Sequence, residues 1–180
     1  MLSPHYRSAR VEYVWQMASV TGEAAAHPVA AESGGFGGAE GILEPGEHAT
    51  RPHPSLPPEA VVEAQLAALL AEDAATVFAF ASPGNQAVTG PLERFSTLLR
   101  NPMYRPLLRH RRSTPYRRTM LTSDSYSEVV QIVSDNTGMP QAIEAVYSWE
   151  LERQGPGAGP LAGCWLTNSV RLLDARPLAS

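Results

Sequence analysis

"AIEAVYSWELER", residues 142–153, alternates between apolar and polar side chains at almost every position. Successive side chains of a β-strand point to opposite faces of the sheet, so this segment is expected to be a half-buried strand. The apolar face carries Ile143, Ala145, Tyr147, Trp149 and Leu151, and the polar face carries Glu144, Ser148, Glu150 and Glu152. The segment therefore predicts a sheet that is covered on one side.

More strands are predicted on both sides of this segment. "SEVVQIVSD", residues 127–135, precedes it, and residues 135–138 have a good turn sequence. "LAGCWLTNSVRLLD", residues 161–174, is expected to be the last strand, and residues 105–121 the first strand and its turn. Strict alternation in the last strand places Trp165 and Arg171 on one face, and Cys164, Leu166 and Val170 on the other.

Three helices are predicted before the strands. The first lies in residues 56–73 and is opened by two prolines at residues 57 and 58. Asp73 is expected to cap a second short helix at residues 74–81, which the Ser-Pro-Gly sequence at 82–84 would end. The third lies in residues 91–101. Helices followed by strands predict an α+β fold with three N-terminal helices packed on a curved antiparallel sheet. The expected contacts between the two layers are Leu66, Phe95, Tyr147 and Trp149.

The residues before this domain differ in composition. Pro, Gly, Ala and Glu dominate residues 21–57, which have too few bulky side chains to offset the entropy cost of ordering. We therefore predict a flexible, largely disordered tail at residues 1–56 and an α+β domain at residues 57–180. Residues 1–20 could form a strand, a partner-binding segment or part of a targeting leader. Their apolar side chains, Val11, Tyr13, Trp15 and Met17, share one side of an extended chain.

Composition excludes several functions. All fourteen basic residues are arginine, so a lysine-containing phosphate loop and a Schiff-base lysine are both excluded. The single cysteine, Cys164, excludes an internal disulfide and a multi-cysteine metal site. No apolar run is long enough to predict a membrane span. No metal-ligand spacing, carboxylate pair or Ser-His-Asp set can be assembled, so no cofactor or metal is expected and no catalytic residue can be named.

The segment "RPLLRHRRSTPYRR", residues 105–118, contains six arginines and no acid. One interpretation is a solvated strand-and-loop surface whose arginines pair with glutamates on neighbouring strands. The other is a basic groove for an anion, RNA or an acidic partner, with Tyr104 and Tyr116 stacking on bases. The net charge of −4 and the absence of a standard RNA-binding motif favour the first, so nucleic acid is an unlikely partner. The arginines are Arg105, Arg109, Arg111, Arg112, Arg117 and Arg118.

Three phrases of the sequence resemble a known family. They are "VVEAQLAALLAEDAATVFAFASP" at residues 61–83, "MYRPLL" at 103–108 and "ELERQGPGAGPLAGCWLTNSVRL" at 150–172. They resemble an uncharacterised domain-of-unknown-function family of the nuclear transport factor 2-like superfamily, which occurs in bacteria, algae and plants. The resemblance covers about residues 58–174 and implies a cone-shaped α+β fold. It implies no known activity.

The function expected from these observations is a non-catalytic binding or assembly module. It would form a homodimer or join a larger complex through the open sheet face that carries Glu144 and Glu150. Two alternatives stay open: an isomerase- or dehydratase-like enzyme for a small apolar ligand in the cone, and an RNA- or anion-binding adaptor that uses residues 105–118. A soluble intracellular protein is expected, and the algal and plant relatives add a plastid as an option. The candidates for pocket-lining residues are Phe80, Tyr104, Tyr147 and Trp149.

Overall fold

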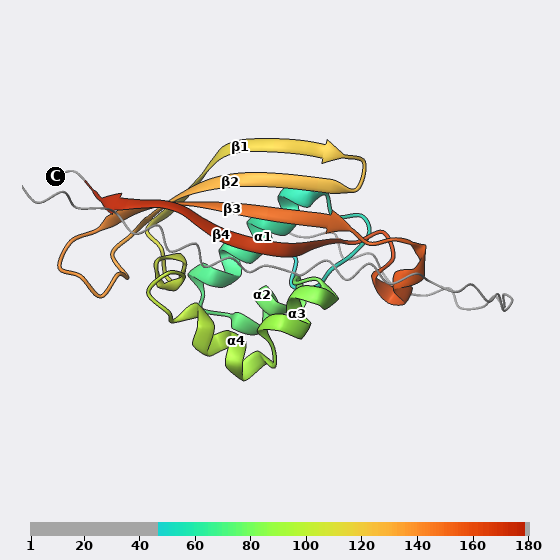
Figure 1. Cartoon of the computed structure of the whole chain (residues 1–180), viewed down its shortest axis with the longest axis horizontal. Coiled ribbons are helices and arrows are strands. Elements are labelled where there is room, and N and C mark those ends of the chain that lie inside the picture. Colours follow the sequence, from blue (N-terminus) through green and yellow to red (C-terminus); the bar gives the residue numbers. More distant parts are fainter. Residues whose placement is uncertain (1–46, 179–180) are drawn as a thin grey trace, which may run out of the picture.

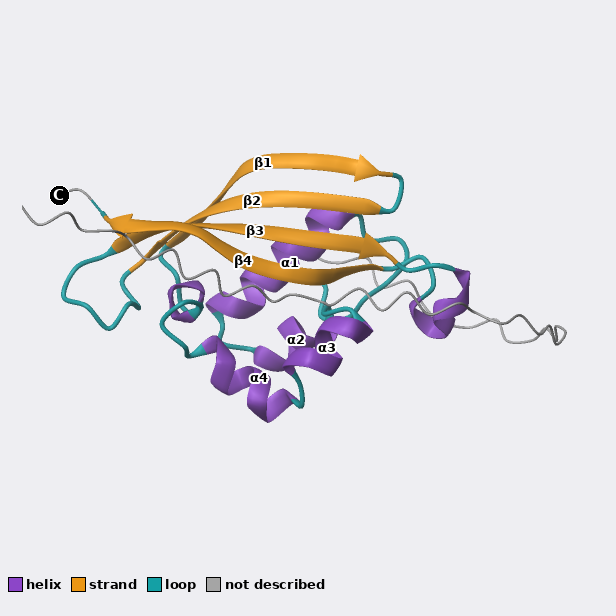
Figure 2. Cartoon of the chain, viewed as in Figure 1, coloured by secondary structure: helices purple, strands orange, loops and turns teal. Residues whose placement is uncertain are grey.

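A computed structural model describes residues 47–178 of the chain. Helices come first in the chain and four strands follow them, which confirms the predicted α+β fold. The strands form one antiparallel sheet in the order β1-β2-β3-β4. Figures 1 and 2 show the helices gathered on one side of the twisted sheet. The α-helices are α1 Pro58–Leu70, α2 Ala74–Ala79, α3 Pro83–Thr89 and α4 Leu92–Leu99; the strands are β1 Arg112–Thr122, β2 Ser125–Ser134, β3 Ile143–Arg153 and β4 Trp165–Pro177.

Most of the tail predicted at residues 1–56 lies outside the described part of the chain, as does the apolar segment near its start. Within the part that is described, Ala49 and Leu56 pack partly buried against the domain core.

The prediction for the helices was wrong in one place. The Ser-Pro-Gly sequence at residues 82–84 does not end the helical region but starts α3. The Ser82 side chain caps this helix by accepting a hydrogen bond from the Asn85 backbone N at 3.3 Å. Serine before a proline is a helix-start signal, because proline lacks the N–H that the first turn leaves unpaired. The region therefore has four α-helices where three were expected.

The prediction for the first strand was also wrong at its start. Arg105–Leu107 forms a short 3₁₀ helix, η1, and β1 begins only at Arg112. Pro106 and the two leucines after it are buried consecutively, whereas a strand would alternate them between two faces. The Ser-Thr-Pro sequence at residues 113–115 lies within β1.

Asp73 caps α2 as predicted. The Thr76 backbone N donates to Asp73 Oδ1 at 3.1 Å, and the Thr76 hydroxyl donates to Oδ2 at 2.6 Å. The side-chain hydrogen bond from Thr76, together with the backbone one, lowers the pKa of the Asp73 carboxyl. The cap therefore stabilises the folded protein above the ordinary pKa of aspartate and loses its effect as pH falls through the lowered value.

We expect Asp73→Ala to lower the free energy of unfolding by about 1 kcal/mol at neutral pH, because the backbone N–H and the hydroxyl of Thr76 both lose their acceptor. Urea denaturation at neutral pH and at about pH 3 checks this, and the loss should shrink at the lower pH. The matched control is Asp73→Asn, which keeps a capping oxygen and should retain most of the stability. Equal losses for both variants would contradict the role of the cap.

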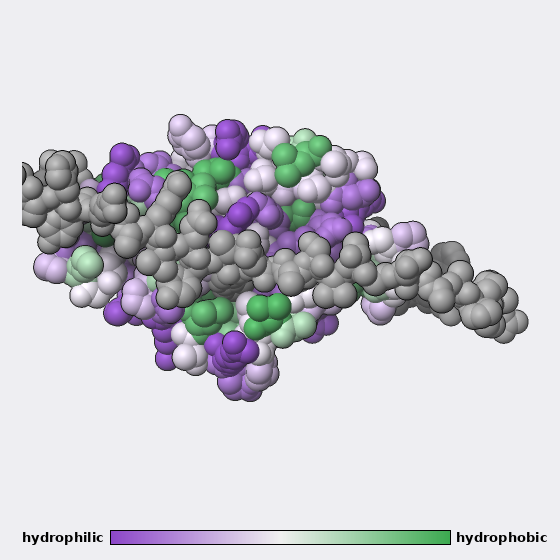
Figure 3. All heavy atoms as spheres, in the orientation of Figure 1, coloured by the Kyte–Doolittle hydropathy of each residue, from purple (hydrophilic) through white to green (hydrophobic). Residues whose placement is uncertain are grey.

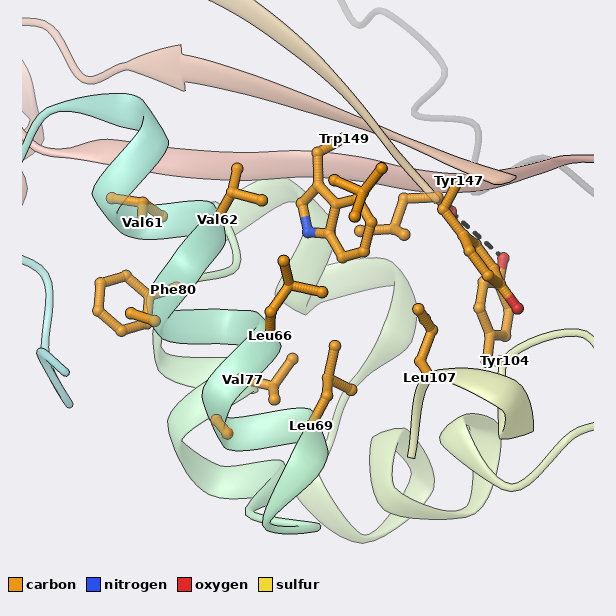
Figure 4. Close-up of a cluster of buried hydrophobic side chains, with 14 of the residues drawn as sticks. Val61, Val62, Leu66, Leu69, Val77, Phe80, Tyr104, Leu107, Tyr147 and Trp149 are labelled. Carbon is orange, nitrogen blue, oxygen red and sulfur yellow. Dashed lines mark hydrogen bonds between the residues drawn. The ribbon is translucent and has the colours of Figure 1, made fainter. Parts of the chain in front are cut away.

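The core lies between the helices and the sheet. Leu66 of α1, Phe95 of α4, and Tyr147 and Trp149 of β3 are all buried in one apolar cluster, which confirms the predicted contacts. Figure 4 shows Tyr147 and Trp149 directed from the sheet toward the helices. The alternation predicted for β3 is confirmed as well, since Ala145 and Leu151 are buried on the same face.

Strict alternation failed in β4. Trp165 and Val170 both belong to the core cluster, although they have opposite parity in the sequence. The cause is a β-bulge: Leu151 pairs with Thr167 and Glu150 with Ser169, which leaves one extra residue in β4. An extra residue moves all later side chains to the other face of the sheet.

Candidate functional site

The space between helices and sheet is filled by side chains. Phe80, Tyr104, Tyr147 and Trp149, the candidates for pocket-lining residues, are all buried in the core cluster. The cavity that Tyr104 and Trp149 line has a volume of about 20 Å³, which suffices for a single water molecule. Pockets for small organic ligands usually measure about 300–1,000 Å³. This cavity therefore has no room for such a ligand.

The buried polar side chains near this cavity are uncharged and form hydrogen bonds centred on Gln65. Gln65 Oε1 accepts hydrogen bonds from Trp149 Nε1 at 3.2 Å and from the Thr167 hydroxyl at 2.7 Å. Its Nε2 donates to the Val77 carbonyl at 3.1 Å. The residues that line the 20 Å³ cavity include no carboxylate and no histidine. Across residues 47–178, no group of His, Cys, Asp and Glu side chains is arranged to hold a metal ion.

Glu128 of β2 is a buried carboxylate that the sequence interpretation missed. It is 1% exposed. The Tyr126 hydroxyl donates to its Oε2 at 2.7 Å, and Arg118 Nε donates to its Oε1 at 3.1 Å. Arg118 also pairs with Glu63 of α1 at 2.9 Å, so the group joins α1 to β1 and β2. Burial, with the bond to Glu128, raises the pKa of Tyr126.

Both oxygens of Glu128 are thus engaged, and this carboxylate acts as part of a clamp. A signal for its burial was present in the sequence. Glu128 alternates with Val130 and Ile132, which are both fully buried on the inner face of β2.

The arginines of residues 105–118 serve different contacts. Arg111 forms a bidentate ion pair with Asp135, with distances of 3.0 and 2.7 Å, and Arg105 Nε donates to Asn136 Oδ1 at 3.1 Å. Both therefore hold the turn between β2 and β3. Arg118 belongs to the buried clamp described above.

The other arginines of this segment, and Tyr104 before it, also lie in different places. The Arg109 backbone N donates to the Leu69 carbonyl at the end of α1. Arg112 and Arg117 pair in register with Val133 and Val129, on the outer face of the sheet. Tyr104 is buried and its hydroxyl donates to the Val170 carbonyl, so its ring cannot stack on a base.

Two β-bulges shape the outer face, which the helices do not cover. In β1, Pro115 pairs with Val130 and Arg117 with Val129, so Tyr116 is an extra residue. In β4, Leu173 is extra in the same way, between the partners of Tyr147 and Val146. The two bulges lie on either side of the level at which Val130 pairs with Tyr147, so they are about one residue apart along the strands. Tyr116 is 78% exposed and Leu173 is 55% exposed.

A hollow of about 380 Å³ lies on this outer face. Bulges bend strands and redirect side chains, and they are frequent next to functional sites. Figure 3 shows apolar patches between strongly hydrophilic side chains along the β1 side of the molecule. The hollow is lined from all four strands by Tyr116, Arg117, Val129, Gln131, Glu144, Val146, Leu173, Asp174 and Arg176.

The charges in the hollow are partly paired. Arg176 Nε donates to Glu144 Oε1 at 2.9 Å, and this contact lowers the pKa of Glu144. Arg117 and Asp174 form no ion pair with another residue of the described chain. The outer face therefore has an apolar centre between two unpaired charges: the positive charge of Arg117 on the edge strand β1 and the negative charge of Asp174 on the edge strand β4.

In the described segment, no helix is long and apolar enough to cross a membrane. A search of curated proteins and a search of solved structures both find no match to the chain. A family model described as "Domain of unknown function (DUF4864)" matches residues 56–179. This match runs from the residues before α1 to the end of β4 and covers more than half of the sequence. The chain therefore belongs to the DUF4864 family.

Proposed function

We propose that this domain is a non-catalytic binding and assembly module that pairs with a second copy of itself through the outer face of its sheet. The observation that carries the proposal is the contrast between the two faces. The cavity between the helices and the inner face has a volume of only about 20 Å³, while the outer face has a hollow of about 380 Å³ flanked by exposed Tyr116 and Leu173. Large exposed apolar side chains rimmed by charges are typical of protein interaction surfaces.

The arrangement of these residues is self-complementary. Tyr116 and Arg117 lie on β1 at one edge of the sheet, and Leu173 and Asp174 lie on β4 at the other edge, offset along the strands by about one and two residues. A two-fold axis parallel to the strands, between β2 and β3, places β1 of one copy over β4 of the other. Tyr116 then lies next to Leu173 of the partner subunit, and the long Arg117 side chain spans the two-residue offset to Asp174 of the partner subunit.

The face is large enough for such a pair. Four strands spaced about 4.8 Å apart, each with about ten residues at 3.3 Å per residue, cover about 600 Å². Stable interfaces bury about 1,200–2,000 Å² in total, so about 600 Å² on each partner reaches the lower end of this range. The filled interior then serves as a rigid scaffold, which agrees with a nuclear transport factor 2-like cone used for assembly.

The same observations weigh against the two alternatives. An isomerase- or dehydratase-like enzyme needs an ionisable group that faces a ligand cavity, whereas both oxygens of Glu128 are bound inside the clamp. An RNA-binding groove needs arginines that share a surface, whereas Arg111 is held by Asp135 before β1 begins and Arg118 is held by the buried Glu128 on the inner face.

We expect light-scattering or ultracentrifugation measurements over a concentration series to show a monomer–dimer equilibrium. Tyr116→Glu and Leu173→Glu should each weaken pairing at least about tenfold, or about 1.4 kcal/mol, because each places a charge in the apolar centre. Met139→Glu is the control, since Met139 is exposed but lies outside the hollow. A mass that stays monomeric at every concentration would refute pairing.

The charges give an independent test of the geometry. Arg117→Glu should weaken pairing because it meets Asp174 of the partner subunit, and Arg117→Glu with Asp174→Arg should restore it. Failure of the double variant to recover would exclude this two-fold axis.

A further inference from the structure

The apolar segment at residues 11–17 precedes the described part of the chain and has a suitable pattern for the outer face. Val11, Tyr13, Trp15 and Met17 occupy every second position, so an extended chain presents all four on one side. The residues between this segment and the domain are mainly small or polar. Residues 11–17 therefore form the most apolar segment before the domain.

We propose that residues 11–17 dock in the hollow on the outer face of the same chain. The apolar lining of the hollow comes from all four strands, Tyr116 and Val129 on one half and Val146 and Leu173 on the other. Four strands at about 4.8 Å spacing span about 15 Å, and seven extended residues span about 20 Å. The segment is therefore long enough to cross all four strands.

Charge complementarity supports the same placement. Arg7 and Arg10 precede the segment and are its basic flank. The lining of the hollow contains two arginines and two acids; Arg176 pairs with Glu144, whereas Asp174 on β4 and Arg117 on β1 form no ion pair in the described chain. If the segment docks with Arg7 and Arg10 toward β4, one of these arginines can form an ion pair with Asp174.

The connecting chain is long enough to allow this contact. Twenty-nine residues separate Met17 from Glu47, where the described chain begins. A coil of this length spans about 30 Å on average, against a radius of gyration of about 14 Å for a domain of this size. The tether gives an effective concentration of about 1 mM, so a segment with an intrinsic Kd of about 0.1 mM fills the hollow about nine-tenths of the time.

Docking in cis would regulate the proposed pairing, because the segment and a second copy need the same hollow. This consequence rests on the proposed function, whereas the docking itself does not. Loss of the segment should then strengthen self-association.

Trp15 provides the first test in the full chain. The protein has three tryptophans, and Trp149 and Trp165 are buried. The emission of wild type minus that of Trp15→Phe isolates Trp15. We expect emission at shorter wavelength than that of free tryptophan in water, unchanged on dilution, and shifted to longer wavelength by Tyr116→Glu and by Leu173→Glu.

The substituted residues are exposed, so both variants should fold, and near-ultraviolet circular dichroism confirms this. Met139→Glu, outside the hollow, should leave Trp15 unchanged. Emission like that of free tryptophan, or emission that neither substitution in the hollow alters, overturns the docking. A blue shift that disappears on dilution also overturns it, because the segment would then bind a second copy.

The second test separates docking from pairing. Trp15→Glu should strengthen self-association several-fold, and Phe36→Glu, which changes an aromatic residue elsewhere in the same region, should not. If wild type and Trp15→Glu both stay monomeric but Trp15 passes the first test, pairing fails and docking holds. If self-association occurs and Trp15→Glu does not change it, regulation by the segment is refuted.

Discussion

Replacing Arg118 with methionine is expected to lower the free energy of unfolding by about 3 kcal/mol. The substitution removes the only cation that contacts Glu128 within residues 47–178 and leaves a carboxylate that is 1% exposed. Removal of one partner from a buried ion pair costs about 3–5 kcal/mol, because the remaining charge loses both water and its counter-ion. The lower end applies here, since the half-exposed Arg118 side chain leaves a space that water can enter.

Chemical denaturation of three variants checks this expectation. Arg111→Met is the matched control, because the ion pair of Arg111 with Asp135 is exposed on both sides and such pairs contribute about 0–1 kcal/mol. Arg118→Met with Glu128→Gln should recover much of the loss, since the amide is neutral and its oxygen can still accept from Tyr126. If Arg118→Met costs no more than Arg111→Met, the clamp does not stabilise the fold.

The clamp also shows what the sequence could reveal and what it could not. The alternation of residues 142–153 was sufficient to place Tyr147 and Trp149 in the core, because β3 has a regular pattern on its inner face. The same parity argument applies to residues 126–132 and points Glu128 inward, but the cation that makes a buried carboxylate stable there is not evident from β2 alone. Arg118 is ten positions away, and its position opposite Glu128 depends on the register of β1.

The hollow on the outer face depended on features that sequence periodicity does not encode. Tyr116 and Leu173 are exposed because each is an extra residue in a bulge. A bulge is defined by the partner strand, and β1 and β4 lie at opposite edges of the sheet. Alternation within one strand therefore predicted faces correctly up to each bulge and wrongly after it, as Trp165 and Val170 demonstrate.

Gln65→Ala is expected to lower the free energy of unfolding by about 3 kcal/mol, although the residue bears no charge. Its amide joins three elements, since it bonds Val77 of α2, Trp149 of β3 and Thr167 of β4 from its place in α1. Truncation leaves the Trp149 indole N–H and the Thr167 hydroxyl buried without an acceptor, and each such group costs about 1–3 kcal/mol. A small cavity adds to the loss.

Gln86→Ala is the matched control, because Gln86 makes one partly buried bond, from its Nε2 to the Phe78 carbonyl at 2.8 Å, and should cost about 1 kcal/mol. Urea denaturation measures both losses, and tryptophan emission reports whether the Trp149 environment changes. Self-association of the folded Gln65→Ala protein should equal that of wild type, because Gln65 contacts the inner face of the sheet and the proposed interface is the outer face. Equal losses for the two glutamines would mean that water already solvates the inner polar groups. The interior would then be open to a ligand, and the case for a purely structural core would fail.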